Sequence, residues 1–227
     1  MTAKKLYLFR HGETQWNVAG RMQGRLDSPL TERGRQQALA HGRLVNQLAK
    51  PDCCWVSSAS RTRGTADLIN LSLGIPLHYS DSLVERDCGS WSGKTLEQVR
   101  QEYPQDWAAR NADAYHHRPG GGENIPDLVQ RFTSLMNQWA QPECLGIVTH
   151  GVVSRAALSH FLGLPAHQVG QIKHPNALVY ELTFDTDRVS VCHYWAELQP
   201  DGQSYEHSGE SIEGLCAQAL YQGLASE

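Results

Sequence analysis

Short apolar runs alternate along this chain with longer segments of helical periodicity, and this alternation restricts the possible folds more than any other feature. The runs at residues 5–9, 53–56 and 145–148 are typical of buried strands. Segments whose apolar residues recur at helical spacing lie between and after them, at residues 33–48, 62–71, 125–139 and 152–162. Strands that alternate with helices predict an α/β three-layer sandwich, with a mostly parallel central sheet and helices on both faces.

The chain length favours one domain rather than two. With 227 residues, a single core can bury most of the apolar surface, and no linker or internal repeat divides the sequence. Residues 177–183 and 189–194 alternate like two strands joined at 185–187, which predicts a hairpin. We expect a single domain over residues 1–227, with a C-terminal tail from about residue 199 in which residues 211–224 have the pattern of a short helix.

Composition narrows the classes of partner. The formal net charge of -4 gives the chain no general attraction for nucleic acid or anionic lipid, so an anionic substrate requires a local cluster of cations. No apolar run is long enough for a membrane span or a signal-peptide core, and the six cysteines lack the spacing of a zinc or redox site. These features predict a cytoplasmic protein without a nucleic-acid or membrane partner, and they carry no information on its oligomeric state.

Polar residues follow three of the predicted strands at the point where each strand ends. Arg10 and His11 come after the first, Arg61 lies shortly after the second, and His150 follows the third. Ligands of such sheets bind beyond the carboxyl ends of the strands. We therefore expect these four residues to meet at one edge of the sheet, as the cation cluster that an anion requires.

The segment Leu8-Phe-Arg-His-Gly-Glu-Thr14 resembles the signature of the histidine phosphatase superfamily, the group that includes cofactor-dependent phosphoglycerate mutase. Four further segments resemble motifs of this family and occur in the family's order, at residues 57–66, 83–93, 121–123 and 149–151. A single Arg-His-Gly would be weak evidence, whereas five ordered motifs are specific. The resemblance covers residues 6–191 and implies phosphoryl-transfer chemistry on an α/β fold.

The resemblance implies that His11 is the nucleophile, which takes the phosphoryl group before water does. A neutral imidazole suits this role because one ring nitrogen keeps its lone pair while a hydrogen bond holds the other. Outside such a motif, a surface histidine at a strand end would be the simpler interpretation. The neighbouring Gly12 is expected to let the backbone pass close to the ligand.

Phosphoryl transfer requires positive charge around the phosphate oxygens. Arg10 and Arg61 can each offer a planar fork of donors to phosphate. The resemblance implies that His150 is a second catalytic histidine, which adds a donor from the opposite side. Gly151 lies at the start of a predicted helix, where backbone amides face a bound anion. Without the family motifs, Arg61 would be interpreted as a solvated residue at a helix start.

Glu85 is the predicted general acid and base. The leaving alkoxide must gain a proton in the first step and water must lose one in the second, and one carboxyl group can do both. Asp87 and Glu97 are competing candidates. Glu85 is preferred because its place before Gly89-Ser-Trp-Ser-Gly93 matches the family pattern.

Three residues near the signature, Asn17, Gln23 and Gly24, resemble the edge of the family's phosphate pocket. No metal site is expected, because the histidines and carboxylates lack metal-ligand spacing and arginines supply the positive charge instead. No cofactor is expected either.

Phosphatases and mutases of this family share such a site. A mutase binds the substrate carboxylate with additional arginines. The family's mutases carry an adjacent pair of arginines in the segment that follows the general acid. Here Arg100, Arg110 and Arg118 are spread apart over residues 94–119. This favours a phosphomonoesterase of small phosphorylated metabolites, similar to the broad-specificity and α-ribazole-type phosphatases. The alternatives are mutase-type phosphoryl transfer and a weakly active relative that only binds phosphorylated ligands.

Overall fold

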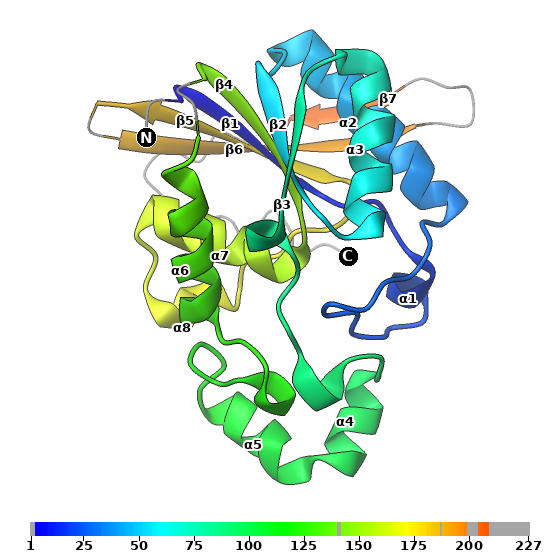
Figure 1. Cartoon of the computed structure of the whole chain (residues 1–227), viewed down its shortest axis with the longest axis vertical. Helices are drawn as coiled ribbons and strands as arrows, with labels where there is room; N and C mark the ends of the chain where they lie inside the picture. The colour runs from blue at the N-terminus through cyan, green and yellow to red at the C-terminus, as the bar shows by residue number, and fades with distance from the viewer. Residues whose placement is uncertain (1–2, 140–141, 187, 199–203, 209–227) are drawn as a thin grey trace.

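One seven-stranded sheet forms the centre of the computed structural model, which describes residues 3–139, 142–186, 188–198 and 204–208 (Figure 1). The strands lie in the order β3-β2-β4-β1-β5-β6-β7. Their bounds are β1 Lys5–Arg10, β2 Cys53–Ser57, β3 Leu77–Ser80, β4 Cys144–Thr149, β5 Leu178–Asp185, β6 Arg188–Leu198 and β7 Ser204–Ser208.

The direction of the strands agrees with the mostly parallel sheet expected from the sequence. β3, β2, β4 and β1 pair in parallel, β5 runs antiparallel to β1, and β6 and β7 each reverse again. Of the seven described strands, five therefore point the same way. The predicted hairpin is confirmed as β5 and β6. β3 and β7 were not expected, and β7 pairs with β6 inside the segment assigned to the tail.

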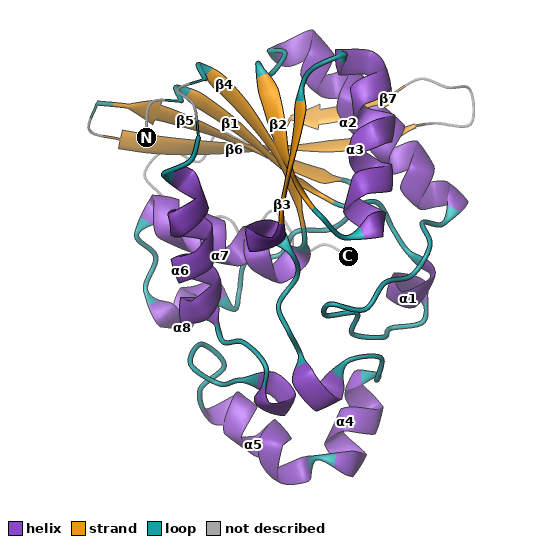
Figure 2. Ribbon diagram, in the orientation of Figure 1, coloured by secondary structure: helices purple, strands orange, loops and turns teal. Residues whose placement is uncertain are grey.

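Helices cover both faces of the sheet (Figure 2). Along β1, Leu6 and Leu8 face a core layer formed with α6 (Ile125–Met136) and α7 (Gly151–Leu162). Tyr7 and Phe9 face the opposite layer, formed with α2 (Glu32–Leu48) and α3 (Ser60–Leu73). This alternation follows from the period of two in a strand that is buried on both faces. The predicted three-layer α/β sandwich is confirmed.

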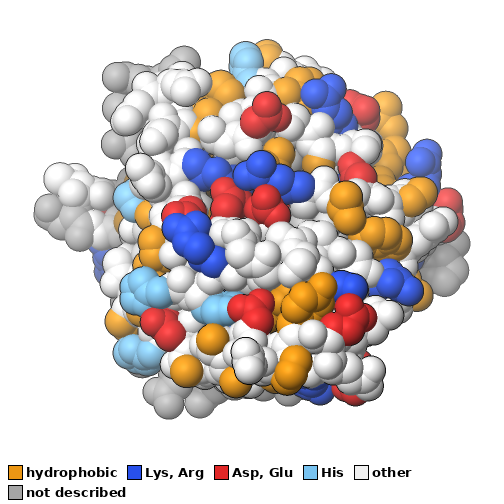
Figure 3. Space-filling model, turned by 60° about the horizontal axis from the view of Figure 1, so that its bottom comes forward, with side chains coloured by type: hydrophobic (Ala, Val, Ile, Leu, Met, Phe, Trp, Pro, Cys, Tyr) orange, Lys and Arg blue, Asp and Glu red, His pale blue; other side chains and the backbone are white. Residues whose placement is uncertain are grey.

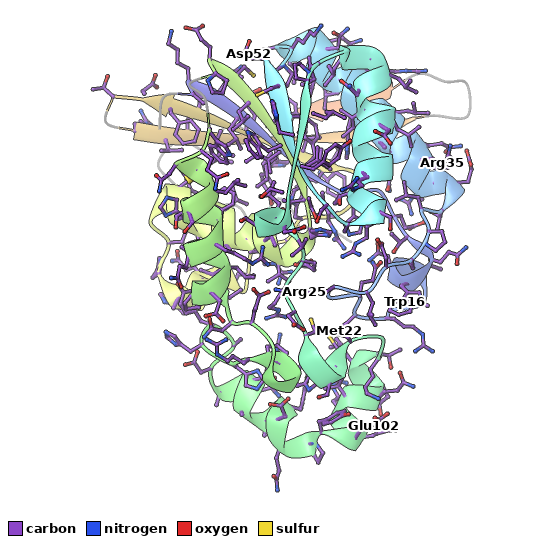
Figure 4. The ribbon with its side chains drawn as sticks, viewed as in Figure 1. Trp16, Met22, Arg25, Arg35, Asp52 and Glu102 are labelled. Atoms are coloured by element: carbon purple, nitrogen blue, oxygen red, sulfur yellow. The ribbon has the colours of Figure 1, made fainter. Side chains whose placement is uncertain are left out.

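Two helices extend the molecule beyond the carboxyl ends of the parallel strands, at the bottom of Figure 1. They are α4 (Leu96–Glu102) and α5 (Pro104–Ala112), flanked by the short 3-10 turns η2 (Gly89–Trp91) and η3 (Pro119–Gly121). A small apolar cluster around Trp91 and Val99 packs them together. Met22, labelled in Figure 4, lies where the sandwich meets this insertion, and its N–H donates to Lys94 O at 2.9 Å.

The sequence predicted the end of α7 but not the end of α6. Gly163 ends α7 in the left-handed conformation (φ 60°), as its position after the periodic segment indicates. α6 ends at Met136, before the expected Trp139. The remaining elements are α1 (Gln15–Val18), η1 (Asp81–Leu83) and α8 (Ala166–Val169). The predicted helix at 211–224 lies outside the described residues, and no helix within them is long and apolar enough to cross a membrane.

Candidate active site

The sheet topology brings the predicted cations to one place. Arg10 ends β1 and His11 follows it, Arg61 lies in the first turn of α3 after β2, and His150 is the N-cap of α7 after β4. Since β2, β4 and β1 are neighbours in the sheet, the three strand ends converge. The convergence expected from the sequence therefore occurs.

A pocket of about 190 Å³ lies at these strand ends. Seven of the nine predicted site residues line it, the exceptions being His150 and Gly151. The full lining is Arg10, His11, Asn17, Arg21, Met22, Gln23, Gly24, Arg61, Glu85, Arg86, Cys88 and Val152.

His11 is held in the form that a nucleophile requires. Its Nδ1 lies 2.8 Å from Gly12 O, and because a carbonyl oxygen only accepts, Nδ1 carries the proton and Nε2 keeps its lone pair. Burial, followed by the charges of Arg10 and Arg61, lowers the pKa of His11 well below 6.5. The ring is therefore neutral at physiological pH, and Asn176 Nδ2 anchors the His11 carbonyl at 2.7 Å.

Gly12 has a different role from the one expected. A Cβ placed there would lie 2.2 Å from Gly34 O, the carbonyl of a residue in the first turn of α2. The small residue thus allows α2 to approach the strand end closely, and approach to a ligand is not the constraint. Thr65 Oγ1 accepts a hydrogen bond from the Gly12 N–H at 3.0 Å and fixes the same turn.

Arg10 and Arg61 are both oriented by backbone carbonyls. Arg10 Nη1 donates to His174 O at 2.7 Å, and burial lowers its pKa to about 10, so it remains a cation at neutral pH. Arg61 donates to Gly24 O at 2.9 Å and to Leu26 O at 2.7 Å. The Nε–H groups of both arginines are buried without a hydrogen-bond partner. Unsatisfied donors of this kind beside one pocket are suited to an anion.

His150 contacts the His11 ring but does not belong to the lining of this pocket. The two rings contact edge to face with centroids 5.2 Å apart. His150 Nε2 and Ser57 Oγ are 2.7 Å apart, whereas the buried Nδ1 has no partner. Burial lowers the pKa of His150 well below 6.5. Gly151 lies against the Arg10 guanidinium, since a Cβ there would be 3.5 Å from Cζ, so it supports Arg10 rather than the pocket.

Glu85 lies in the pocket wall with both oxygens oriented by backbone amides. Oε1 accepts from Arg86 N at 2.8 Å, and Oε2 accepts from Val152 N at 3.3 Å at the start of α7. Of the two competing acids, Asp87 caps Gly89 N at 2.8 Å and Glu97 is an exposed residue of α4. Neither lines the pocket, so the preference for Glu85 agrees with the geometry.

The motif at residues 121–123 holds the loop that carries Glu85. Glu123 Oε2 accepts from Asp87 N at 2.9 Å, and Oε1 accepts from Arg131 Nε at 3.1 Å. Arg131 in turn donates to Val84 O at 2.6 Å. Residues on both sides of Glu85 are thereby fixed by one ion pair. Arg25, labelled in Figure 4, adds a second cation 3.4 Å from Glu123.

Asn17 and Gln23 shape the pocket edge through Thr14. Thr14 and Asn17 form a reciprocal cap at the start of α1, and Gln23 Nε2 donates to Thr14 Oγ1 at 2.8 Å. The Oε1 atom of Gln23 is buried without a partner. Gly24 has a left-handed backbone conformation, with φ 52°. Its carbonyl oxygen accepts a hydrogen bond from Arg61.

Several residues of the site were not predicted from the sequence. Arg21, Arg86 and Val152 line the pocket, and His174 and Asn176 orient Arg10 and His11 from a loop far along the chain. Only Arg86 had a local signal, as the neighbour of Glu85. On the face shown in Figure 3, Lys and Arg side chains gather beside acidic ones near the middle, with histidines to one side. Within the described part of the chain, no group of three or more His, Cys, Asp or Glu is placed to hold a metal ion.

The buried histidines make stability depend on pH. Burial lowers the pKa values of His11, His150 and His174, the last to about 3. The unfolded chain takes up these protons near pH 6.5, so the free energy of unfolding should fall as pH drops below about 6.5. For His174 alone we expect a loss of about 1.4 kcal/mol between pH 7.5 and 5.5. Urea unfolding at both pH values measures the free energy of unfolding. If that free energy were the same at pH 7.5 and pH 5.5, these rings would take up protons in the folded protein as they do in the unfolded chain.

Comparison with known proteins gives a consistent result. The sequence model of the histidine phosphatase superfamily (branch 1) matches residues 6–197. The 6-phosphofructo-2-kinase/fructose-2,6-bisphosphatase of Gallus gallus is 33% identical over 184 residues, a match that covers 81% of this chain and 38% of that protein. This chain thus spans well under half the length of the curated relatives it matches.

Two solved phosphatase structures share the fold. The α-ribazole phosphatase from Shigella flexneri has a TM-score of 0.74 at 26% identity, covering 82% of this chain and 93% of that one. The mycobacterial glucosyl-3-phosphoglycerate phosphatase in complex with VO3 has a TM-score of 0.72 at 29% identity, with the same coverages of 82% and 93%. With the family match extending over the strand ends and the pocket, this chain belongs to the histidine phosphatase superfamily, branch 1.

Proposed function

We propose that this protein is a phosphomonoesterase, which hydrolyses small phosphorylated metabolites through a phosphohistidine intermediate on His11. The observation that carries the proposal is the neutral His11, with Nδ1 bonded to Gly12 O, beside the unpartnered Nε–H groups of Arg10 and Arg61. A phosphate oxygen can satisfy those donors, while His11 Nε2 supplies an electron pair to phosphorus. The two structural relatives that are phosphatases support hydrolysis of a phosphate ester.

Two displacements complete the reaction. In the first, His11 Nε2 forms a bond to phosphorus, the ester P–O bond breaks, and protonated Glu85 gives its proton to the leaving alkoxide. In the second, the Glu85 carboxylate takes a proton from water, the water oxygen forms a bond to phosphorus, and the P–N bond breaks. Inorganic phosphate leaves, and Glu85 is protonated for the next turnover. His150 contacts the His11 ring, and we infer that its Nδ1, which has no hydrogen-bond partner, donates to the transferring group during the reaction.

A mutase would differ from a phosphatase only in the molecule that accepts the phosphoryl group from His11. In a mutase the acceptor is a second phosphorylated substrate, and in a phosphatase it is water. Of the three arginines considered in the sequence, Arg118 pairs with Asp127, and Arg100 and Arg110 lie against the Trp107 ring at 4.9 and 5.2 Å. None of the three lines the pocket that contains His11. This arrangement favours water as the acceptor.

Turnover of p-nitrophenyl phosphate near pH 6 tests the proposal, together with inhibition by vanadate. With 3-phosphoglycerate, a coupled enolase assay separates the two activities. We expect release of inorganic phosphate and little 2-phosphoglycerate, whether or not bisphosphoglycerate is added. Efficient production of 2-phosphoglycerate, stimulated by bisphosphoglycerate, would identify a mutase. A protein that binds vanadate and turns over neither compound would be a binding relative.

A further inference from the structure

The two ring nitrogens of His150 have different surroundings, and a buried serine contacts one of them. His150 follows β4 and Ser57 ends β2, and these neighbouring parallel strands pair with Val56 opposite Val148. This register brings the end of β2 beside His150, where Ser57 Oγ lies 2.7 Å from His150 Nε2. Both residues are fully buried. The other nitrogen, Nδ1, is also buried, and no residue that the structure describes forms a hydrogen bond with it.

The His150 ring is neutral, so only one of its nitrogens carries a proton. Burial, followed by the charges of the site residues Arg61 and His11, lowers the pKa of His150 well below 6.5. A neutral imidazole has one nitrogen that donates a hydrogen bond and one that accepts. The negatively charged oxygens of a phosphoryl group accept hydrogen bonds. His150 can therefore bind a phosphoryl group through Nδ1 only in the tautomer in which Nδ1 carries the proton.

The contacts of Ser57 favour this tautomer. Its Oγ accepts a hydrogen bond from the Ala59 N–H at 3.4 Å, and within the described part of the chain its own proton has one acceptor, His150 Nε2. If Ser57 donates to Nε2, then Nδ1 carries the proton, and one buried group, the Nδ1 N–H, lacks a partner. If Nε2 donates to Ser57 instead, two buried groups lack partners, the serine proton and the Nδ1 lone pair, and the lone pair repels a phosphate oxygen. Because an unpaired buried polar group is costly, the first arrangement is the more stable one.

We propose that Ser57 is a positioning residue, which donates to His150 Nε2 and thereby holds the ring proton on Nδ1, where it serves the phosphoryl group. This inference rests on the proposed phosphatase function. It assigns a role to a residue that does not belong to the lining of the catalytic pocket.

The two histidines of the site then have the same tautomer, fixed by opposite means. The Gly12 carbonyl holds the proton on Nδ1 of His11 because a carbonyl oxygen only accepts. The Ser57 hydroxyl holds the proton on Nδ1 of His150 because it donates to the other nitrogen. His11 therefore keeps a lone pair on Nε2 for phosphorus, and His150 offers a donor to the phosphoryl oxygens.

Heteronuclear NMR of the histidine rings tests the tautomer directly. The chemical shift of a ring nitrogen shows whether it carries a proton, and its couplings to the carbon-bound ring protons show which nitrogen it is. His150→Leu assigns the His150 signals by their disappearance. At neutral pH we expect a protonated Nδ1 and a bare Nε2 in the wild-type protein, and a mixture of tautomers or the reversed form in Ser57→Ala. A bare Nδ1 in the wild-type protein would overturn the proposal, as would an unchanged tautomer in Ser57→Ala.

Vanadate affinity and kcat measure what the tautomer contributes. Ser57→Ala should weaken vanadate binding and lower kcat for p-nitrophenyl phosphate by about 10-fold or more each, the usual value of a hydrogen bond to a charged group. KM should change much less, because the donor acts most strongly on the charge that develops during transfer. Circular dichroism shows whether the variant is folded.

Ser154 provides a matched control. It is a buried serine of α7 whose Oγ donates to the backbone carbonyl of His150 at 2.7 Å. Ser154→Ala therefore removes a hydroxyl group that contacts the same histidine, but not its ring. We expect it to change kcat and vanadate affinity by less than about 2-fold and to leave the tautomer unchanged. Equal losses in Ser57→Ala and Ser154→Ala would contradict a role of Ser57 through the ring.

The His150→Leu protein shows whether Ser57 acts through His150. In that background Ser57→Ala should weaken vanadate binding by less than about 2-fold, against about 10-fold in the wild type, because the ring that Ser57 orients is gone. The same loss in both backgrounds would mean that Ser57 acts by another route, and the proposal would be wrong.

The same experiments separate this inference from the proposed function. If p-nitrophenyl phosphate is hydrolysed while Nδ1 of His150 is bare, the phosphatase function stands and the role of Ser57 is wrong. If no ester is hydrolysed, but Nδ1 is protonated and vanadate affinity depends on Ser57 and not on Ser154, the positioning role stands and the phosphatase function is wrong.

Discussion

Replacing His11 by Ala should lower kcat for p-nitrophenyl phosphate by at least about 10⁴-fold, the largest effect expected of any substitution in this chain. The reason is that the tautomer fixed by the bond between Nδ1 and Gly12 O, at 2.8 Å, leaves the lone pair of Nε2 available to phosphorus. Without it, no covalent intermediate forms. Wild-type protein quenched in base should be checked in parallel for a phosphoryl group that is stable to base and lost on later treatment with acid.

The exposed His78 provides the control for this prediction. It lies on β3, where its ring packs against Trp55 at a centroid distance of 5.2 Å, away from the pocket. His78→Ala should change kcat by less than about 2-fold, the range of ordinary surface substitutions. Phosphate that stays on the His11→Ala protein after quenching, or kcat within about 10-fold of the wild type, would show that another residue is the nucleophile.

Replacing Glu85 by Gln should slow hydrolysis of alkyl phosphates by about 10²- to 10⁴-fold, the usual contribution of general acid catalysis. The amide keeps the size of the side chain and one of the two acceptor oxygens that face Arg86 N and Val152 N, but it is far too weak an acid to protonate a leaving group. p-Nitrophenolate is stable without a proton, so the loss for p-nitrophenyl phosphate should be much smaller. Comparing kcat/KM for glycerol 3-phosphate and p-nitrophenyl phosphate measures the difference.

The two alternative acids serve as controls for Glu85. Glu97→Gln should leave both substrates unaffected, because Glu97 is exposed on α4. Asp87→Asn should affect folding more than chemistry, because Asp87 caps Gly89 N at 2.8 Å. An equal loss for the alkyl and the nitrophenyl ester in Glu85→Gln would exclude Glu85 as the acid.

The fold and the centre of the site were predictable because their signals are local. A strand buried on both faces shows as an apolar run, and a helix shows as a period of 3.6 residues, whatever the rest of the chain does. The α/β order then places the ends of parallel strands at one edge, which is why the sequence alone could group Arg10, His11 and Arg61. β3 was missed because Leu77-His-Tyr-Ser80 is short and only partly apolar, which is too weak a pattern to indicate a strand.

The residues that orient the catalytic side chains could not be predicted, because their positions depend on how the layers of the sandwich pack. Arg10 donates to the His174 carbonyl, 164 residues further along the chain, and Asn176 donates to the His11 carbonyl from 165 residues away. Glu123 accepts from Asp87 N in the Glu85 loop, 36 residues earlier in the sequence. No periodicity encodes such pairs, because each contact forms only when separate elements are packed against one another.

The arginines show most clearly which features could be predicted from the sequence and which required the tertiary structure. Along the sequence, Arg100, Arg110 and Arg118 are dispersed and form no adjacent pair. In three dimensions, Arg110 meets Arg86 and Arg155 at one pocket. The sequence by itself determined the sandwich, the order of the motifs and the residues at the strand ends, since these depend on neighbours within a strand or a helical turn. Only the tertiary structure decided which distant charges share a pocket, because that depends on where the α5 insertion lies relative to α7.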